Sequence, residues 1–274
     1  MLILVSTPIG NLQDITLRSL DVLRSCDLIL CEDTRVSINL LKHFEIETPL
    51  QSFHKFNEAK TQEKVIEALK AGKKIALISD AGTPAINDPG LRLVQACLAE
   101  GIAVSASPGA CSAIVALTLS GLETSKFQYL GFIPKKQGEK LRFLAETIDY
   151  SGTSILFESP ERILDTLEML SKLIPERPAA LARELTKTYE EVRRKPVQEL
   201  WESVRENPPR GEMILMIGGS STPAWSGLSP QEHMALLQKE FDINSQDALK
   251  LVAYLRDIPK RALYSEIHIK NIID

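Results

Sequence analysis

Short apolar runs that end in turn-forming loops constrain the fold of this chain more than any other feature. Residues 2–5 and 75–78 are continuous apolar runs, as expected of parallel strands covered on both faces. The segments 6–11, 79–84 and 107–112 each follow a predicted strand and are rich in turn-forming residues. Ligands of open α/β sheets bind where loops leave the carboxyl ends of strands. We therefore expect the three loops to hold a ligand, largely through backbone groups.

The loop at residues 79–84 is central to this pattern. Its glycine, Gly82, lets a backbone approach a ligand closely, and Pro84 stiffens the exit of the loop. Asp80 is placed to accept hydrogen bonds from a small polar ligand. A single loop of this composition is more often an ordinary strand-to-helix turn. The presence of three such loops favours a binding site.

The first half of the chain alternates predicted strands with predicted helices, which indicates a parallel α/β domain. Helices are expected from about residue 16, with leucines on one stripe, and from about residue 58 to 70. The other expected features are strands at 28–31 and 102–106, an N-cap at Asp88 with Pro89 at the first helical position, and a small-residue helix reaching about residue 120.

The second half has fewer regular signals. Residues 134–140 are expected to form a basic, mobile loop, and Ser159 with Pro160 to cap a helix. The other predicted features are strands at 127–131, 153–157, 179–182 and 213–217, a helix at 197–206, a linker at 218–227 and short helices at 230–240, 244–256 and 259–272. We predict an N-terminal α/β domain at 1–121, a C-terminal α/β domain at 122–219 and a helical tail at 228–274.

Composition limits the class of protein. The chain has 274 residues, of which 44% are hydrophobic and 25% charged, as in soluble globular proteins. Its formal net charge of -4 argues against general nucleic-acid stickiness, so any RNA contact must come from local basic patches. Four scattered cysteines are expected to be reduced core residues, and no metal pattern is present. Without a membrane-spanning apolar run or a basic signal region, we expect a cytoplasmic protein.

Several nucleotide-binding and catalytic motifs are absent from the sequence. It contains neither the Gly-x-Gly-x-x-Gly dinucleotide fingerprint nor the Gly-x-x-x-x-Gly-Lys-Ser/Thr phosphate loop. The Gly-x-Ser-x-Gly nucleophile elbow is also missing. A nucleoside-like ligand without an obligatory pyrophosphate is therefore expected. S-adenosylmethionine is a good candidate, although the physical argument does not single it out.

An ordered set of motifs carries a family resemblance over nearly the whole chain. The motifs are Ser6-Thr-Pro-Ile-Gly-Asn11, Glu32-Asp-Thr-Arg35, Ser79-Asp-Ala-Gly-Thr-Pro84, Asp88-Pro-Gly90, Pro108-Gly109, Gly131-Phe-Ile-Pro134, Phe157-Glu-Ser-Pro160 and Ala182-Arg-Glu-Leu-Thr-Lys187. Together they closely resemble the ribose 2′-O-methyltransferases of bacterial 16S ribosomal RNA. That family belongs to the tetrapyrrole-methylase-like, or class III, methyltransferases.

The resemblance implies two α/β domains with S-adenosylmethionine in the cleft between them, usually in a homodimer. It also implies a cofactor site whose residues come from both domains. In this sequence they are Pro8, Asp80, Gly82, Thr83, Ile86, Pro108, Gly109 and Ser112 from the first half, with Phe157, Leu185 and Met213 from the second.

The implied reaction is attack of a ribose 2′-oxygen on a sulfonium methyl, in which alignment and a proton acceptor both help. The candidates for catalytic roles near the implied cleft are Glu32, Arg35, His54, Glu184 and Lys187, and Asp33, Glu58 and Glu158 are further possible bases. Residues 32–35 fit a structural role, as a helix cap with a surface ion pair, almost as well as they fit a catalytic role. His54 lies between two phenylalanines and fits a packing role equally well. The sequence does not single out the base.

Basic clusters are the candidate RNA contacts, because they can track phosphates. The candidates are Arg18, Lys135, Lys136, Lys140 and Arg142, with Arg193, Arg194 and Lys195. Each cluster taken singly fits an ordinary solvated surface as well as it fits an RNA contact. The expected partner is 16S ribosomal RNA or the 30S subunit, and no metal is required. Two alternatives stay open: a precorrin-type tetrapyrrole methylase of the same superfamily, and a cofactor-sensing RNA-binding module without turnover.

Overall fold

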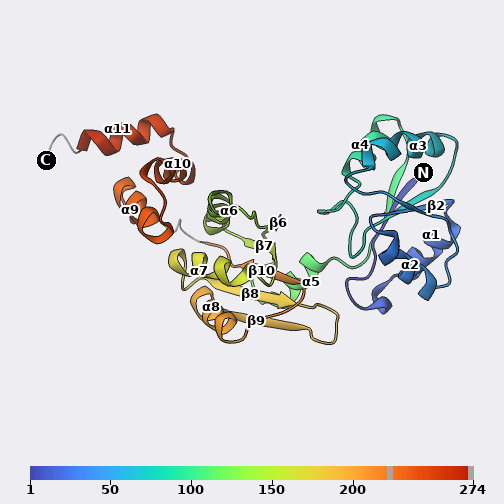
Figure 1. Ribbon diagram of the computed structural model, residues 1–274, viewed down its shortest axis with the longest axis horizontal. Helices are drawn as coiled ribbons and strands as arrows, with labels where there is room; N and C mark the ends of the chain where they lie inside the picture. The colour runs from blue at the N-terminus through green and yellow to red at the C-terminus, as the bar shows by residue number, and fades with distance from the viewer. Residues whose placement is uncertain (221–224, 271–274) are drawn as a thin grey trace. The chain divides into compact units, whose positions relative to one another are not determined.

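The computed structural model describes residues 1–220 and 225–270 and contains two compact units (Figure 1). Unit 1 consists of Met1–Val115 together with Leu185–Glu190. Unit 2 consists of Ala116–Glu184 and Glu191–Asp274. The domain boundaries expected at 121, 219 and 228 stay predictions, and the part of the predicted linker at 221–224 lies outside the described residues.

Unit 1 is built on a five-stranded sheet in which every neighbouring pair is parallel, as predicted. Its strand order is β3-β2-β4-β1-β5, which makes β4 the central strand. The elements are β1 (Leu2–Val5), the short helix η1 (Leu12–Asp14), α1 (Leu17–Ser25), β2 (Leu28–Cys31), α2 (Thr34–His43), β3 (Leu50–Ser52), α3 (Glu58–Lys70), β4 (Ile75–Ile78), α4 (Leu91–Ala99) and β5 (Val104–Ser107).

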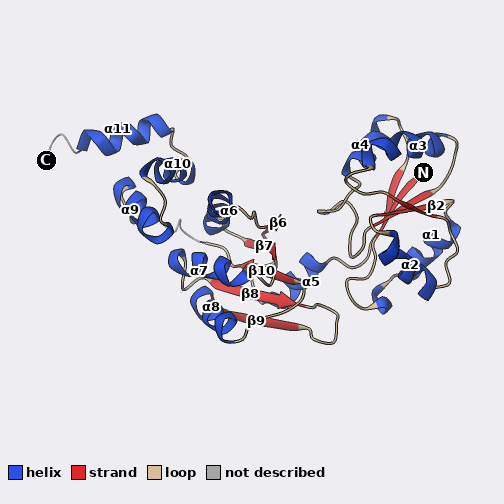
Figure 2. Cartoon of the chain, in the orientation of Figure 1, coloured by secondary structure: helices blue, strands red, loops and turns tan. Residues whose placement is uncertain are grey.

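The strands β1, β2 and β4 contribute buried residues to cores on both faces of this sheet, which explains their continuous apolar runs. Successive side chains alternate between the faces, so Ile3 and Val5 join the core beneath α1 and α2. Leu2 and Leu77 join the opposite core, beneath α3 and α4. Figure 2 shows these two helix pairs on opposite sides of the strands. Unit 1 is therefore a three-layer α/β/α structure.

Unit 2 contains a mixed sheet with the order β6-β7-β10-β8-β9. Only β6 and β7 pair in parallel, whereas β10 is antiparallel to both of its neighbours. The elements are β6 (Phe127–Phe132), α6 (Gln137–Asp149), β7 (Thr153–Glu158), α7 (Ile163–Leu173), β8 (Pro178–Arg183), β9 (Glu191–Pro196), α8 (Val197–Glu206), β10 (Met213–Ile217), α9 (Pro230–Phe241), α10 (Ser245–Leu255) and α11 (Lys260–Lys270). Helix α5 (Ser112–Ser120) contributes residues to both units.

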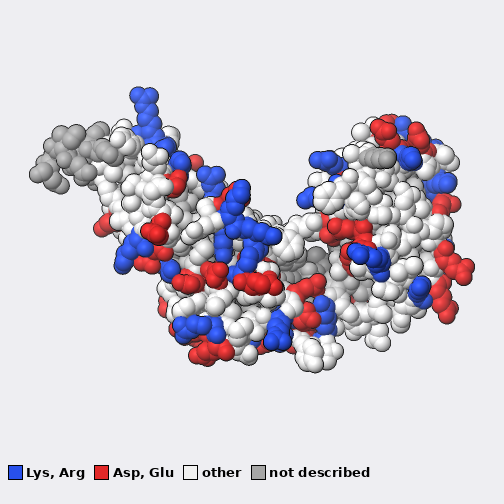
Figure 3. Space-filling model, in the orientation of Figure 1, with Lys and Arg blue, Asp and Glu red and all other residues white. Residues whose placement is uncertain are grey.

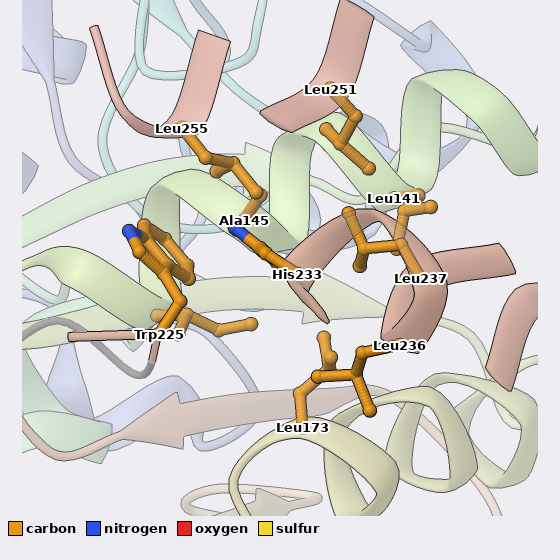
Figure 4. A pocket seen from close by; sticks show the side chains of 10 residues that line it. Leu141, Ala145, Leu173, Trp225, His233, Leu236, Leu237, Leu251 and Leu255 are labelled. Carbon is orange, nitrogen blue, oxygen red and sulfur yellow. The ribbon is translucent and has the colours of Figure 1, made fainter. Parts of the chain in front are cut away.

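The three C-terminal helices share a core with unit 2. Leu141 and Ala145 of α6 pack with Leu237, Val252 and Leu263 from α9, α10 and α11. A small apolar cavity of about 30 Å³ remains between α6, α7 and the first two tail helices (Figure 4). The predicted tail helices are thus confirmed, and they pack against the α/β part of unit 2.

Several local predictions were wrong. Helix α4 begins at Leu91, with Gly90 as its N-cap at a φ of 129°, so Asp88 does not cap it. Helix α7 begins only at Ile163 and Ser159 is not its cap. Residues 134–140 are not one loop, because α6 begins at Gln137.

Two strands, β3 and β9, were not predicted. β3 is only three residues long, and β9 carries the charged sequence Glu-Val-Arg-Arg-Lys-Pro at an edge of its sheet. Among the described residues, no helix is both long and apolar enough to cross a membrane.

Candidate active site

The strand order of unit 1 gathers the predicted binding loops at one edge of the sheet. β2, β4, β1 and β5 are consecutive neighbours and run in the same direction. The loops that follow them therefore leave the same edge, where ligands of open α/β sheets bind. The structure thus brings the three predicted loops together, and their role in holding a ligand stays a prediction.

Direct hydrogen bonds join the loops that follow β1, β4 and β5. The amides of Thr7 and Gly82 each donate to the carbonyl of the other, at 2.9 and 3.1 Å. Thr83 Oγ1 donates to the Ala110 carbonyl at 3.2 Å, which ties the β4 loop to the β5 loop. A Cβ placed on Gly109 would lie 2.9 Å from Cβ of Ser6, so glycine permits the third contact.

The segment Leu185–Glu190 packs against the first of these loops. A Cβ on Gly10 would lie 2.6 Å from Cγ of Lys187, and the amide of Asn11 donates to Thr186 Oγ1 at 3.1 Å. Leu185 is buried. Lys187 is therefore next to the β1 loop. Glu184, which directly precedes the segment, belongs to unit 2, where its carboxylate accepts a hydrogen bond of 3.0 Å from the Glu212 amide.

An open hollow of about 390 Å³ lies beside the loops, in unit 1. Its lining comes from the ends of three neighbouring strands, β2, β3 and β4, and consists of residues 32–35, Ser52, residues 54–56 and Asp80. Three predicted catalytic residues, Glu32, Arg35 and His54, and one predicted cofactor residue, Asp80, therefore lie together.

Burial and nearby carboxylates raise the pKa values of two carboxyl groups at this end of the sheet. Burial and the nearby Asp80 carboxylate raise the pKa of Glu32. Burial, with the charges of Glu32 and Asp80, raises the pKa of Asp88 to about 6. A carboxyl that titrates near neutral pH is suited to accept and release a proton. Asp88 was predicted only as a helix cap, and its position beside Glu32 and Asp80 could not be read from spacing in the sequence.

Arg35 is held by a local ion pair. Its Nη2 lies 2.6 Å from Oδ2 of Asp33, and the Asp33 carboxylate also caps α2 by accepting from the Arg35 amide at 2.9 Å. The cap and surface ion pair that the sequence left open as an alternative is thus present. The Asp33 amide in turn donates to Asp80 at 3.1 Å, which joins the β2 and β4 loops.

Three residues of unit 2 with predicted site roles make contacts that support the fold. Phe157 packs edge-on against Tyr129 and Phe132, and Met213 is buried in β10. Glu158 is buried and pairs with Arg162, so this candidate base already has a charged partner.

The remaining predicted cofactor residues of unit 1 differ in exposure. Pro8 is buried, Ile86 is about half exposed, Pro108 is exposed and Ser112 begins α5.

Two of the predicted RNA contacts are contradicted by burial. Lys140 is only 7% exposed within α6, and burial lowers its pKa. Arg193 is enclosed by its ion pair with Glu191 and by hydrogen bonds to the Ser203 and Asn207 carbonyls.

The other basic candidates are exposed, but several have partners. Arg18 donates to the Ala106 carbonyl, Arg194 to the Leu119 carbonyl, and Lys195 pairs with Glu199. Lys136 pairs with Glu139 and Arg142 lies over the Tyr254 ring, and both, like Lys135, are exposed. Figure 3 shows basic side chains gathered over α6.

The sequence profile of the tetrapyrrole (corrin/porphyrin) methylases matches residues 1–200. The chain belongs to this family. The chain is 41% identical over 273 residues to ribosomal RNA small subunit methyltransferase I of Halalkalibacterium halodurans, covering 97% of this chain and 94% of that protein. With the protein of the same name from Bacillus subtilis, identity is 39% over 278 residues, covering 99% and 95%. Within the tetrapyrrole methylases, the chain thus groups with the small-subunit ribosomal RNA methyltransferases I.

Solved structures share the tetrapyrrole methylase fold. A diphthine synthase is 12% identical with a TM-score of 0.62, covering 90% of this chain and 98% of that one. Uroporphyrin-III C-methyltransferase of Thermus thermophilus, in complex with S-adenyl homocysteine, is 18% identical with a TM-score of 0.54, covering 79% and 96%. These likenesses support the predicted fold class of two α/β units and a helical tail.

Proposed function

We propose that the protein transfers a methyl group from S-adenosylmethionine to the ribose 2′-oxygen of a cytidine in the decoding region of 16S ribosomal RNA. The observation that carries the proposal is 41% identity over nearly the whole chain to ribosomal RNA small subunit methyltransferase I. The substrate is 16S ribosomal RNA or the 30S particle, and the reaction takes place in the cytoplasm.

The loops of unit 1 fit S-adenosylmethionine. Their contacts use backbone carbonyls, amides and hydroxyls, the groups that hydrogen-bond a nucleoside. The carboxylate of Asp80 supplies negative charge suited to ribose hydroxyls and to a cationic sulfonium. A tetrapyrrole methylase structure that holds S-adenyl homocysteine supports the same choice of cofactor. Pro8, Asp80, Gly82, Thr83, Ile86, Pro108, Gly109, Ser112, Phe157, Leu185 and Met213 remain our proposed cofactor residues.

The residues of the hollow provide alignment and a proton acceptor. When bound, S-adenosylmethionine supplies an electrophilic methyl group, which the 2′-oxygen attacks as the carbon–sulfur bond breaks. Glu32 and His54 line the hollow from the ends of neighbouring strands, and both are residue types that can act as a general base. The Phe56 amide donates to His54 Nδ1 at 3.2 Å, which leaves Nε2 to carry the proton of the neutral ring. In that tautomer His54 is a donor, so we assign the acceptor role to Glu32.

We assign two of the other predicted catalytic groups, Arg35 and Lys187, to substrate binding. Arg35 is exposed at the hollow, and Lys187 is next to the β1 loop, so each cation can pair with a phosphate. Glu184 is tied to the Glu212 amide within unit 2 and serves the turn that follows β8.

The proposal is tested by methyl transfer. Purified protein is incubated with radiolabelled S-adenosylmethionine and 30S subunits from cells that lack the modification, with naked 16S RNA in parallel. We expect label in 2′-O-methylcytidine, and loss of transfer in Glu32→Gln with cofactor binding retained. Cofactor binding without label in either RNA contradicts the proposal, and transfer to a tetrapyrrole instead supports the precorrin-type alternative.

We also propose that the protein is a homodimer. Helix α5 is apolar nearly all round, yet Ile114 on it is 43% exposed. A helix without a polar face is normally buried, so a second chain is expected to cover α5. Light scattering should give twice the chain mass of 30.4 kDa, and Ile114→Glu should shift the protein toward the monomer.

A further inference from the structure

Phe56 is the most exposed large apolar side chain at the candidate site. It is 97% exposed, whereas the neighbouring Phe53 is fully buried and anchors the same segment. Full burial of a phenylalanine contributes roughly 1.5–3 kcal/mol to stability, and Phe56 contributes none of this to the isolated chain. Its exposure is therefore not explained by the packing of unit 1.

The turn that carries Phe56 is braced by hydrogen bonds. The Asn57 side chain accepts from the His54 amide at 2.8 Å and donates to the Ser52 carbonyl at 3.1 Å. The amides of Asn57 and Glu58 both donate to the His54 carbonyl at 2.9 Å. The turn thus presents Phe56 in a defined position, which lowers the entropy lost when a ligand stacks on the ring.

Phe56 lies at the rim of the hollow, where the chemistry matches a nucleotide. Among the residues that line the hollow, Arg35, Lys55, Phe56 and Asp80 are exposed, whereas Glu32 and His54 are half-buried. Cations bind a phosphate, an aromatic ring stacks on a base, and carboxylate or imidazole groups bind ribose hydroxyls. Three kinds of group for the three parts of one nucleotide therefore surround a hollow of about 390 Å³.

We propose that Phe56 is the stacking platform for the base of the nucleotide to be methylated, with Lys55 on its phosphate. The ligand is a single-stranded pyrimidine ribonucleotide, extruded from its RNA so that the sugar reaches the carboxylates of the hollow. This inference rests on the proposed function and adds substrate-binding residues to it. Stacking on a π-face tolerates any base, so this contact positions the nucleotide without selecting cytidine.

The test compares Phe56→Ala, Phe56→Trp and a control, Leu98→Ala. Leu98 is 63% exposed near the end of α4, a helix antiparallel to the strands, so it lies toward the opposite edge of the sheet. For each variant, kcat and KM are measured with unmodified 30S subunits or naked 16S RNA, whichever the wild type prefers. Binding of S-adenosylmethionine is measured separately by calorimetry, and stability by thermal unfolding.

We expect Phe56→Ala to lower kcat/KM roughly 10- to 100-fold through a higher KM, as for loss of one stacked base. Phe56→Trp should stay within about threefold of the wild type, because tryptophan retains a stacking face. Cofactor affinity and melting temperature should not change in either variant, and Leu98→Ala should resemble the wild type.

A second arm tests the phosphate contact. Lys55→Ala should reduce the slope of log KM against log salt concentration by about 1, as expected for one lost phosphate contact. Phe56→Ala should leave that slope unchanged, because stacking releases no counterions.

Three results would overturn the inference while wild-type methyl transfer keeps the proposed function intact. They are an unchanged KM in Phe56→Ala, failure of Phe56→Trp to restore activity, and a loss of cofactor affinity or stability in Phe56→Ala. The last result would assign Phe56 to the cofactor site or to the fold. Absence of transfer by the wild type would instead contradict the proposed function itself.

Discussion

At the scale of single residues, equivalent side chains at strand ends differ in role because their partners differ. Glu32 follows β2 and Glu158 ends β7. Glu32 faces the hollow, where burial and Asp80 raise its pKa. Glu158 is buried, pairs with Arg162, and accepts from Thr166 Oγ1 at 2.9 Å and from the Ser159 amide at 2.8 Å. Both oxygens of the Glu158 carboxylate thus already have partners inside the protein, so we interpret Glu158 as a structural residue.

Glu158→Gln should therefore lower stability without a selective effect on chemistry. The change leaves the Arg162 guanidinium without its anion, and we expect a cost of about 2 kcal/mol or more in the free energy of unfolding. Urea denaturation measures this cost. The control is Glu168→Gln in the exposed Glu168–Lys172 pair of α7, which should change stability by about 0.5 kcal/mol or less. A stable Glu158→Gln protein with a large loss of kcat would instead make Glu158 a catalytic residue.

At the scale of elements, the site depends on how closely the strand-end loops approach one another. The Thr7–Gly82 pair and the Thr83–Ala110 contact join loops more than twenty residues apart in sequence. Gly109 approaches Ser6 so closely that a Cβ would be 2.9 Å from the serine Cβ. The close spacing of the β1 and β5 loops therefore depends on the absence of a side chain at Gly109.

Gly109→Ala should weaken cofactor binding more than it weakens the fold. The new methyl group forces the β1 and β5 loops apart, and we expect roughly tenfold lower affinity for S-adenosylmethionine, measured by calorimetry, with at most about 1 kcal/mol lost in stability. Gly138→Ala is the control, because a Cβ there meets no atom within 4 Å. It lies in α6 and should leave affinity unchanged while stabilising the helix slightly. Equal cofactor affinity in both variants would contradict the role of the loop contact.

At the scale of the whole molecule, the helical tail meets the α/β part of unit 2 at Trp225, which belongs to the core of that part and lies against a buried histidine of α9. His233 is 2% exposed, stacks on Trp225 with centroids 5.0 Å apart, and accepts from Arg256 Nε at 3.3 Å (Figure 4). Burial and the Arg256 charge lower the pKa of His233 to about 4. The tail thus docks through a neutral imidazole.

Acid should weaken this docking. The unfolded chain binds a proton at His233 near pH 6.5, whereas the folded chain binds it only near 4, so stability is lost as pH falls through this window. The loss is about 3.5 kcal/mol at most, at 1.4 kcal/mol for each pKa unit. Urea denaturation at pH 7.5 and 4.5 should show a smaller difference for His233→Gln than for the wild type. His43→Gln, at an exposed site on α2, should match the wild type, and an equal pH dependence in all three proteins would contradict this assignment.

Particular elements show which features a local sequence pattern predicts and which features it misses. The apolar runs 2–5 and 75–78 predicted parallel strands, since strands covered on both faces have no polar alternation. β3 and β9 were missed because a three-residue edge strand and a charged edge strand carry no such run. The burial of Lys140 was also missed, because a basic tract resembles a surface loop until α6 turns one of its lysines inward.

The sequence by itself determined the parallel sheet, its strand-end loops, the tail helices and the family, because these depend on local periodicity and on motif order. Only the tertiary structure decided which groups meet. The hollow joins Glu32, His54 and Asp80 because β2 lies between β3 and β4 in the sheet, although β4 does not follow β2 directly in the chain. The raised pKa of Asp88 and the exposure of Phe56 likewise depend on burial and on distances of a few ångströms. Such distances arise only when segments far apart in sequence pack together.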